Sequence, residues 1–222
     1  MKLHFLTNLS LIKQIAQLRD ISLSKIDDVV LMVDAKKNKE KLKRQWEKYQ
    51  ETIENNIKNI VRNEWVDNLD VKIFVFPDYI QVGACNCEEL KILFGCKEEY
   101  PGFGLITICH EIIHMLIYKY RKDRKVSRLT DEVFVFLSAE CELRKRLLNK
   151  DYFSGFFSGQ LSPFHKDALQ ISKKLVENWN SYLLNKTISC KSFLDFIEKN
   201  ISINMKEGYD NIKLTDFIGG KR

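Results

Sequence analysis

Apolar residues recur at intervals of three or four along the first third of the chain. One such stripe runs through Leu42, Trp46, Tyr49, Ile53, Ile57 and Ile60. Because a period near 3.6 places these residues on one face of a helix, the stripe predicts a long amphipathic helix over residues 34–65. A shorter helix is expected before it, over residues 9–18.

A short apolar run at residues 29–33 precedes the long stripe. Three valines, a leucine and a methionine suit a buried strand as well as the interior of a helix. Periodicity does not separate the two structures in a run this short, so both stay open.

The period changes near residue 70. Residues 71–76 are mainly β-branched or aromatic, end before Pro77, and are apolar on nearly both faces, which is typical of a central strand. Residues 80–82 and 90–94 predict two further short strands, the second of which ends at Gly95.

Helical patterns return after the predicted strands. The apolar run over residues 105–118 predicts a buried helix, and a second helix is expected to extend to about Leu148. Thr130 or Asp131 is predicted to be its N-cap, because either side chain can accept a hydrogen bond from the first turn. The last third carries two more stripes: Ala168, Ile171, Leu175, Trp179 and Tyr182, then Phe193, Leu194, Ile197 and Ile201.

The predicted elements fit one domain that mixes helices with a small sheet. A chain of 222 residues with 45% hydrophobic and 30% charged residues can bury a core, and its composition excludes disordered and fibrous proteins. We expect a single α+β domain over residues 1–222. It has a helical N-terminal part (1–66), a central core (67–150) and a helical C-terminal part (151–222).

The first six residues hint at a signal peptide, but polar residues follow from Thr7 and no small-residue cleavage site appears. The longest apolar runs are shorter than the roughly 20 residues of a membrane span. We therefore expect a soluble, cytoplasmic protein with no membrane partner.

The formal net charge of +6 is modest for this length. Basic residues crowd residues 36–44 and 121–128, where they are expected to form solvated surfaces. No motif that reads nucleic acid accompanies them, so nucleic acid is not the expected partner.

The six cysteines have irregular spacing and no secretory context, which favours thiols over a disulfide framework. Cys85, Cys87 and Cys96 are candidates for a structural zinc site. Their spacing is not the paired C-x-x-C of such sites and no fourth ligand is evident, so thiols of the core or of a strand are favoured.

The candidate chemistry lies inside the predicted helix at residues 105–118, where the sequence reads His110-Glu111-Ile112-Ile113-His114. Two histidines four residues apart project from one face of a helix, so both imidazoles can reach one Zn²⁺ ion. Glu111 lies beside them and can take the proton of a zinc-activated water. The alternative is a buried helix whose histidines are hydrogen-bonded core residues.

The residues around this motif carry no charge other than Glu111, from Thr107 through Leu116. The stretch resembles the extended His-Glu-x-x-His motif of the zincin metallopeptidases. That resemblance implies a zincin-like core: a small mixed sheet, a motif helix and a helix with the third ligand. It also implies an edge strand, within residues 83–94, that holds an extended peptide.

A second motif follows at residues 131–134, Asp-Glu-Val-Phe, and resembles that of the gluzincin clan. The resemblance implies Glu132 as the third zinc ligand, and the 17 residues between His114 and Glu132 are close to the clan's usual spacing. Glu140 competes for this role from the same predicted helix. The resemblance covers residues 70–148.

The predicted function is a zinc-dependent metallopeptidase with one zinc ion, acting on a peptide or protein, with Glu111 as general base. His110, His114 and Glu132 are the expected metal ligands. One alternative is another zinc amide hydrolase, similar to peptide deformylase, with Cys87 or Cys96 as third ligand. The other is a catalytically silent protein of this fold that binds a partner or DNA.

Two residues beyond the motifs are candidates for stabilising the oxyanion of a tetrahedral intermediate: Tyr152 and His165. The alternative, a packed tyrosine and a surface histidine, is favoured for both.

Overall fold

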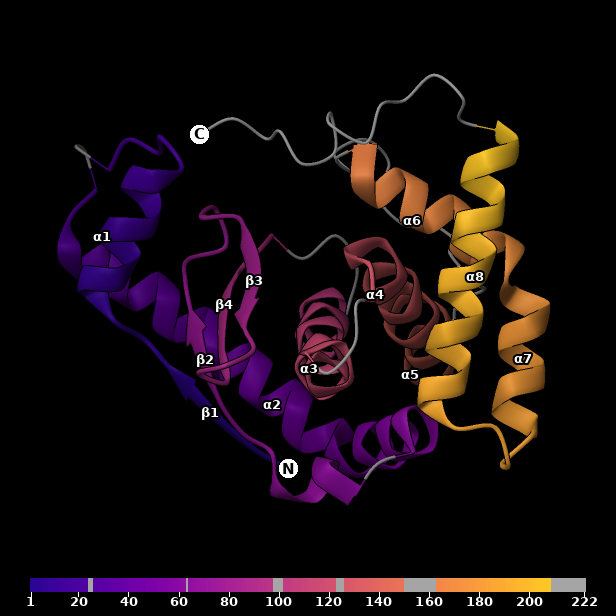
Figure 1. Ribbon diagram of the computed structural model, residues 1–222. Helices are drawn as coiled ribbons and strands as arrows, with labels where there is room; N and C mark the ends of the chain where they lie inside the picture. Colours follow the sequence, from indigo (N-terminus) through magenta and orange to yellow (C-terminus); the bar gives the residue numbers. More distant parts are fainter. Residues whose placement is uncertain (24–25, 63, 98–101, 123–125, 150–162, 209–222) are drawn as a thin grey trace.

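Four short strands form a single sheet toward one side of a largely helical chain (Figure 1). The computed structural model describes residues 1–23, 26–62, 64–97, 102–122, 126–149 and 163–208. The strands are β1 (Lys2–Leu6), β2 (Asp70–Val75), β3 (Val82–Asn86) and β4 (Lys91–Gly95), in the order β1-β2-β4-β3. β2 is parallel to β1 and β4, while β3 is antiparallel to β4. The sheet is therefore small and mixed, as expected, and β1 and β3 are its edges.

The first edge strand, β1, is missing from the sequence prediction, which expected a helical N-terminal part with residues 29–33 as its one possible strand. Leu3 pairs with Val71 and Phe5 with Ile73 across the parallel ladder. The side chains on the other face of β1 are exposed. The strand is short, and it is only half apolar. Its partner lies more than sixty residues away, and local periodicity carries no information about such a partner.

The other edge strand, β3, begins where the predicted strand at residues 80–82 was expected to end. Ile80 instead lies in a turn, in which its N–H donates to the carbonyl of Pro77 at 3.0 Å. This turn passes very close to Gly95, since a Cβ on Gly95 would lie 2.2 Å from the Ile80 carbonyl oxygen. The predicted strand at residues 90–94 is confirmed with a shift of one residue, as β4.

Two helices connect β1 to β2. α1 (Leu9–Leu18) has the predicted bounds, and α2 (Asp28–Val61) includes residues 29–33, which excludes the strand alternative there. Asp27 caps α2 by accepting the Val29 N–H at 2.6 Å. The helix ends at Val61, earlier than expected, because Arg62 adopts a left-handed conformation. A short 3₁₀ turn, η1 (Glu64–Asn68), then leads into β2.

The motif lies on α3 (Phe103–Lys122), which packs against β3 and against the helix that follows it. That next helix is expected to be continuous, but it has three parts: α4 (Arg128–Val135), a π-helical segment η2 (Phe136–Leu143) and α5 (Arg144–Leu148).

The start of α4 corrects the predicted N-cap. Ser127 is the cap, because its hydroxyl oxygen accepts the Thr130 N–H at 3.2 Å. Thr130 and Asp131 lie inside the first turn and are buried. Glu198 accepts hydrogen bonds from the backbone N–H and the hydroxyl of Ser127, and this contact ties the start of α4 to the C-terminal helices.

Three helices complete the described chain: α6 (Pro163–Lys174), α7 (Val176–Leu184) and α8 (Cys190–Gly208). The stripe from Ala168 to Tyr182 thus belongs to two helices rather than one. α4 packs against α6 and α8 around an aromatic cluster in which Phe134, Trp179 and Phe193 make edge or tilted contacts. The side chains that follow Glu132 on α4 are therefore held firmly in the core.

Candidate metal centre

Three side chains from two helices meet between α3 and α4. His110 and His114 lie one turn apart on α3, and their Nε2 atoms approach to 3.2 Å. Glu132, from α4, places Oε1 3.4 Å from His110 Nε2 and Oε2 3.4 Å from His114 Nε2. These three residues form a group that can hold a metal ion.

The distances within this group can be compared with a tetrahedral site. Zinc binds imidazole nitrogen at about 2.0–2.1 Å, so two such nitrogens in a tetrahedral site lie about 3.3–3.4 Å apart. The Nε2–Nε2 separation of 3.2 Å agrees with that spacing, and each Nε2 atom lies 3.4 Å from a different oxygen of the Glu132 carboxylate. Glu132 Oε1 is also buried without a hydrogen bond of normal geometry. A buried carboxylate oxygen of this kind fits a metal ligand.

Each histidine has a second carboxylate on its other ring nitrogen. Asp131 Oδ1 lies 3.1 Å from His114 Nδ1, and Glu140 Oε1 lies 3.7 Å from His110 Nδ1. Both carboxylates are buried. Such partners usually orient metal-binding imidazoles, since they hold Nδ1 and leave Nε2 facing the ion.

The positions of Glu132 and Glu140 separate the two competing carboxylates. Glu132 faces the Nε2 atoms of both histidines, whereas Glu140 faces the Nδ1 atom of His110 alone. Glu140 lies within the π-helical segment η2. The wider turn of a π-helix changes the direction of the side chains that follow it, and such segments are frequent at functional sites.

The charges of the group are mutually stabilised. Burial lowers the pKa of His114, but hydrogen bonds with Asp131 and Glu132 outweigh it and raise that pKa to about 9. Burial also lowers the pKa of His110, yet the nearby carboxylates of Glu132 and Glu140 leave it well above its ordinary value. Burial raises the pKa of Glu132, while the two nearby imidazoles bring it far below its usual range.

Glu111 lies on α3 between the histidine pair and the edge strand β3, and it is 8% exposed. A Cβ on Gly83 of β3 would lie 3.6 Å from Glu111 Oε1, so the strand passes directly beside this carboxylate. Because Gly83 has no side chain, space remains between β3 and the Glu111 carboxylate. Glu111 therefore faces the strand, on which its charge raises the pKa of Cys85.

Of the two candidate oxyanion residues, the structure brings one to the metal group. His165, on α6, places Nε2 3.6 Å from Glu132 Oε1, and its ring makes edge contacts with Phe136 and Phe164. Its side chain is 37% exposed. Burial lowers its pKa. His165 is thus at the rim of the group rather than a remote surface residue, while Tyr152 lies outside the described residues.

No cysteine belongs to the metal group formed by the described residues. All six cysteines lie in the described part of the chain and carry thiols, as expected. Cys85 and Cys87 approach each other to 3.6 Å between sulfurs, and the Cys96 thiol donates to the Lys97 carbonyl at 3.1 Å. The sulfur ligand expected for a deformylase-like site is therefore absent from this group.

Comparison with known proteins adds no information about the site, which is therefore interpreted from its own residues. No family model matches the chain, and neither curated proteins nor solved structures give a match. Among the described residues, no helix is both long enough and apolar enough to cross a membrane.

Proposed function

We propose that this chain is a zinc-dependent metallopeptidase. The observation that carries the proposal is the convergence of His110 Nε2, His114 Nε2 and the Glu132 carboxylate at separations of 3.2–3.4 Å, with Glu111 beside them. Two imidazoles and one carboxylate are a donor set of catalytic zinc sites, which keep one position open for water or substrate. The zincin-like fold is part of this proposal and rests on the two sequence motifs.

When bound, zinc would act as a Lewis acid toward the substrate carbonyl and lower the pKa of water in the site. Glu111 is the general base: its carboxylate takes a proton from the attacking water and later delivers it to the leaving amine. His110, His114 and Glu132 hold the ion. Asp131 and Glu140 keep the two imidazoles in the orientation that binds it.

The edge strand β3 supplies the surface for an extended peptide. β3 is at the end of the sheet and packs against the motif helix α3. A peptide that pairs with such an edge gains backbone hydrogen bonds without side-chain specificity. Gly83 lies beside Glu111. We therefore expect the scissile bond to lie in the space above the Cα atom of Gly83.

The position of His165 supports a role in charge stabilisation. Its Nε2 atom lies 3.6 Å from Glu132 Oε1, on the rim of the metal group. We propose that it donates a hydrogen bond to the oxygen that becomes negatively charged during hydrolysis.

A metal-loading experiment with a peptide library tests the proposal. The purified protein is stripped with a chelator, reloaded with one equivalent of zinc, and incubated with mixed peptides whose new termini are identified by mass spectrometry. We expect cleavage by the zinc-loaded protein and none by the stripped protein. Stoichiometric zinc uptake without cleavage would favour the catalytically silent alternative, and failure to take up zinc would reject the metal site as well.

A further inference from the structure

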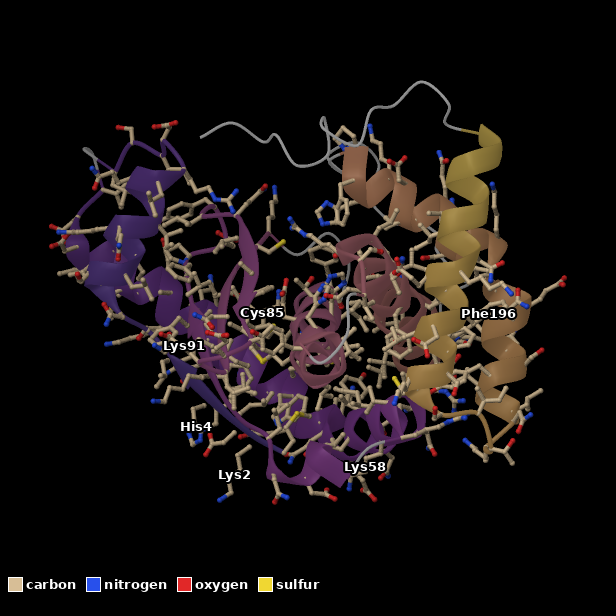
Figure 2. All side chains as sticks on the ribbon, in the orientation of Figure 1. Lys2, His4, Lys58, Cys85, Lys91 and Phe196 are labelled. Atoms are coloured by element: carbon tan, nitrogen blue, oxygen red, sulfur yellow. The ribbon has the colours of Figure 1, made fainter. Side chains whose placement is uncertain are left out.

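Two thiols lie at the end of the edge strand that faces the candidate site. Cys85 is in β3, and Cys87 is the first residue of the turn that follows it. Their sulfurs are 3.6 Å apart and both side chains are half-buried. Figure 2 labels Cys85 in the region between the sheet and α3. The two thiols thus contact each other, and both side chains are partly exposed, so small molecules can approach them.

Cys85 also lies on the side of β3 that faces the proposed general base, Glu111. Gly83 and Cys85 lie two residues apart on β3, so both project toward the same side of the strand. Glu111 Oε1 lies 3.6 Å from the position of a Gly83 Cβ. Hydrogen bonding with Cys87, burial, and the charge and hydrogen bonding of Glu111 all raise the pKa of Cys85. The raised pKa keeps the Cys85 thiol protonated on the side of β3 that faces Glu111.

The backbone near Cys87 leaves room for the two sulfurs to approach. The β3–β4 ladder ends at the pair Asn86 and Lys91, so Cys87 lies outside it. The Asn86 side chain accepts the N–H groups of Glu88 and Glu89 at 3.1 and 3.0 Å, which defines the turn. Closing a disulfide of about 2.0 Å requires the sulfurs to move about 1.6 Å closer. A bond across one intervening residue is strained, and strained disulfides are the easily reduced, regulatory kind.

We propose that Cys85 and Cys87 form a reversible disulfide that lowers hydrolysis at the neighbouring site. The effect on hydrolysis rests on the proposed function, whereas the formation of the bond does not. The oxidant is a low-molecular-weight disulfide, for which oxidised glutathione is the probe.

The chemistry proceeds by thiol–disulfide exchange. The thiolate of one cysteine attacks a sulfur of the oxidant, forms a mixed disulfide and releases one glutathione thiolate. The thiolate of the other cysteine then attacks the protein sulfur of this mixed disulfide and releases the second. The pair loses two electrons and two protons, and the two released glutathione thiolates take up these protons, by way of solvent, to become two thiols. Because the pKa of Cys85 is raised, its attack at neutral pH is slow and accelerates as the pH rises.

Two consequences follow for the site once the bond has formed. The protonated Cys85 thiol near Glu111 is replaced by a disulfide sulfur, which carries no hydrogen. The movement of that sulfur toward Cys87 also bends β3 at the position that pairs with Ile92 of β4. Both changes fall beside Glu111, on the strand where a peptide is expected to pair.

The test uses the full-length, zinc-loaded protein with oxidised glutathione. We expect the six thiols to fall to four. The intact mass should fall by about 2 Da, and both changes should reverse with dithiothreitol. Peptide mapping should place the bond between Cys85 and Cys87. Amide hydrogen exchange in β3 should become faster, and hydrolysis should fall by about tenfold or more with zinc content unchanged.

Two variants control this test. Cys96→Ser removes another half-buried thiol from the same part of the chain and should behave as the wild type. Cys87→Ser should show no loss of about 2 Da, because an internal bond needs both sulfurs. A bond elsewhere, no bond, or a bond that leaves β3 exchange and hydrolysis unchanged would overturn the inference. If the reduced, zinc-loaded protein cleaves no peptide, the proposed function fails, and the bond and the exchange rates still decide the inference.

Discussion

Asp131 and Glu132, two consecutive residues of α4, contact opposite nitrogens of the same imidazole. Asp131 Oδ1 lies 3.1 Å from His114 Nδ1, and Glu132 Oε2 lies 3.4 Å from His114 Nε2. The first turn of α4 thus orients His114 and completes the metal group at the same time. Ser127 and Glu198 fix this turn through the cap, so the start of α4 determines the geometry of the site.

The first prediction concerns the identity of the third ligand. Glu132→Ala should lose most of the bound zinc, because this carboxylate faces both Nε2 atoms. Glu140→Ala, in the adjoining segment η2, is the matched control and should keep most of its zinc while binding it more weakly, because Glu140 contacts only the Nδ1 atom of His110 and is not a ligand. Metal content of the two purified proteins is the measurement. The reverse pattern would move the ligand to Glu140.

The second prediction concerns the orientation of His114. Asp131→Ala should weaken zinc binding by about 10- to 100-fold, since loss of such a partner typically has this effect. Asp131→Asn should bind zinc more tightly than Asp131→Ala, because the Asn oxygen can still accept the Nδ1–H. Competition with a chelator gives the dissociation constants. Equal affinities for wild type and Asp131→Ala would reject the orienting role.

The third prediction concerns pH. In the metal-free protein the pKa of His114 is raised to about 9, so below that pH the imidazole carries a proton that an incoming ion must displace. Apparent zinc affinity should therefore rise as the pH increases toward about 9. The raised pKa of His114 also stabilises the metal-free fold. This stabilisation is fully present at pH values below the ordinary histidine pKa and is lost as the pH rises through about 9. Zinc titrations at several pH values measure the first effect, and an affinity independent of pH between 6 and about 9 would contradict it.

The fourth prediction concerns the basic residues at 36–44 and 121–128, of which 123–125 lie outside the described residues. Their binding to nucleic acid should be weak and should collapse with added salt, because only the electrostatic contribution is available. Fluorescence anisotropy with labelled DNA at two salt concentrations measures this. Tight, sequence-dependent binding at physiological salt would instead support the DNA-binding alternative.

The histidine pair was predictable because its geometry is local. His110 and His114 are one helical turn apart wherever the helix lies, and the uncharged residues around them indicate burial. Glu132 was predictable from its neighbours, because Asp131 and Phe134 complete the Asp-Glu-Val-Phe motif with it. The structure then brings all three residues together.

Other features depend on contacts that local patterns do not contain. β1 exists because Leu3 and Phe5 pair with a strand more than sixty residues away. Ser127 is the N-cap in place of the predicted Thr130 or Asp131. Those two side chains lie inside the first turn of α4, where Thr130 donates to Glu198 and Asp131 contacts His114. The π-helical turn at Glu140 and the proximity of Cys85 to Glu111 depend on the packing of separate elements.

The central claim is that Glu111 is the general base of a zinc hydrolase, and one substitution tests it most directly. Glu111→Gln keeps the size of the side chain and removes no metal ligand, so zinc content and thermal stability should stay close to those of the wild type. Hydrolysis of a peptide cleaved by the wild type should fall by about 10²- to 10⁴-fold, the usual effect of losing a general base. Hydrolysis near the wild-type rate by zinc-loaded Glu111→Gln would contradict the account.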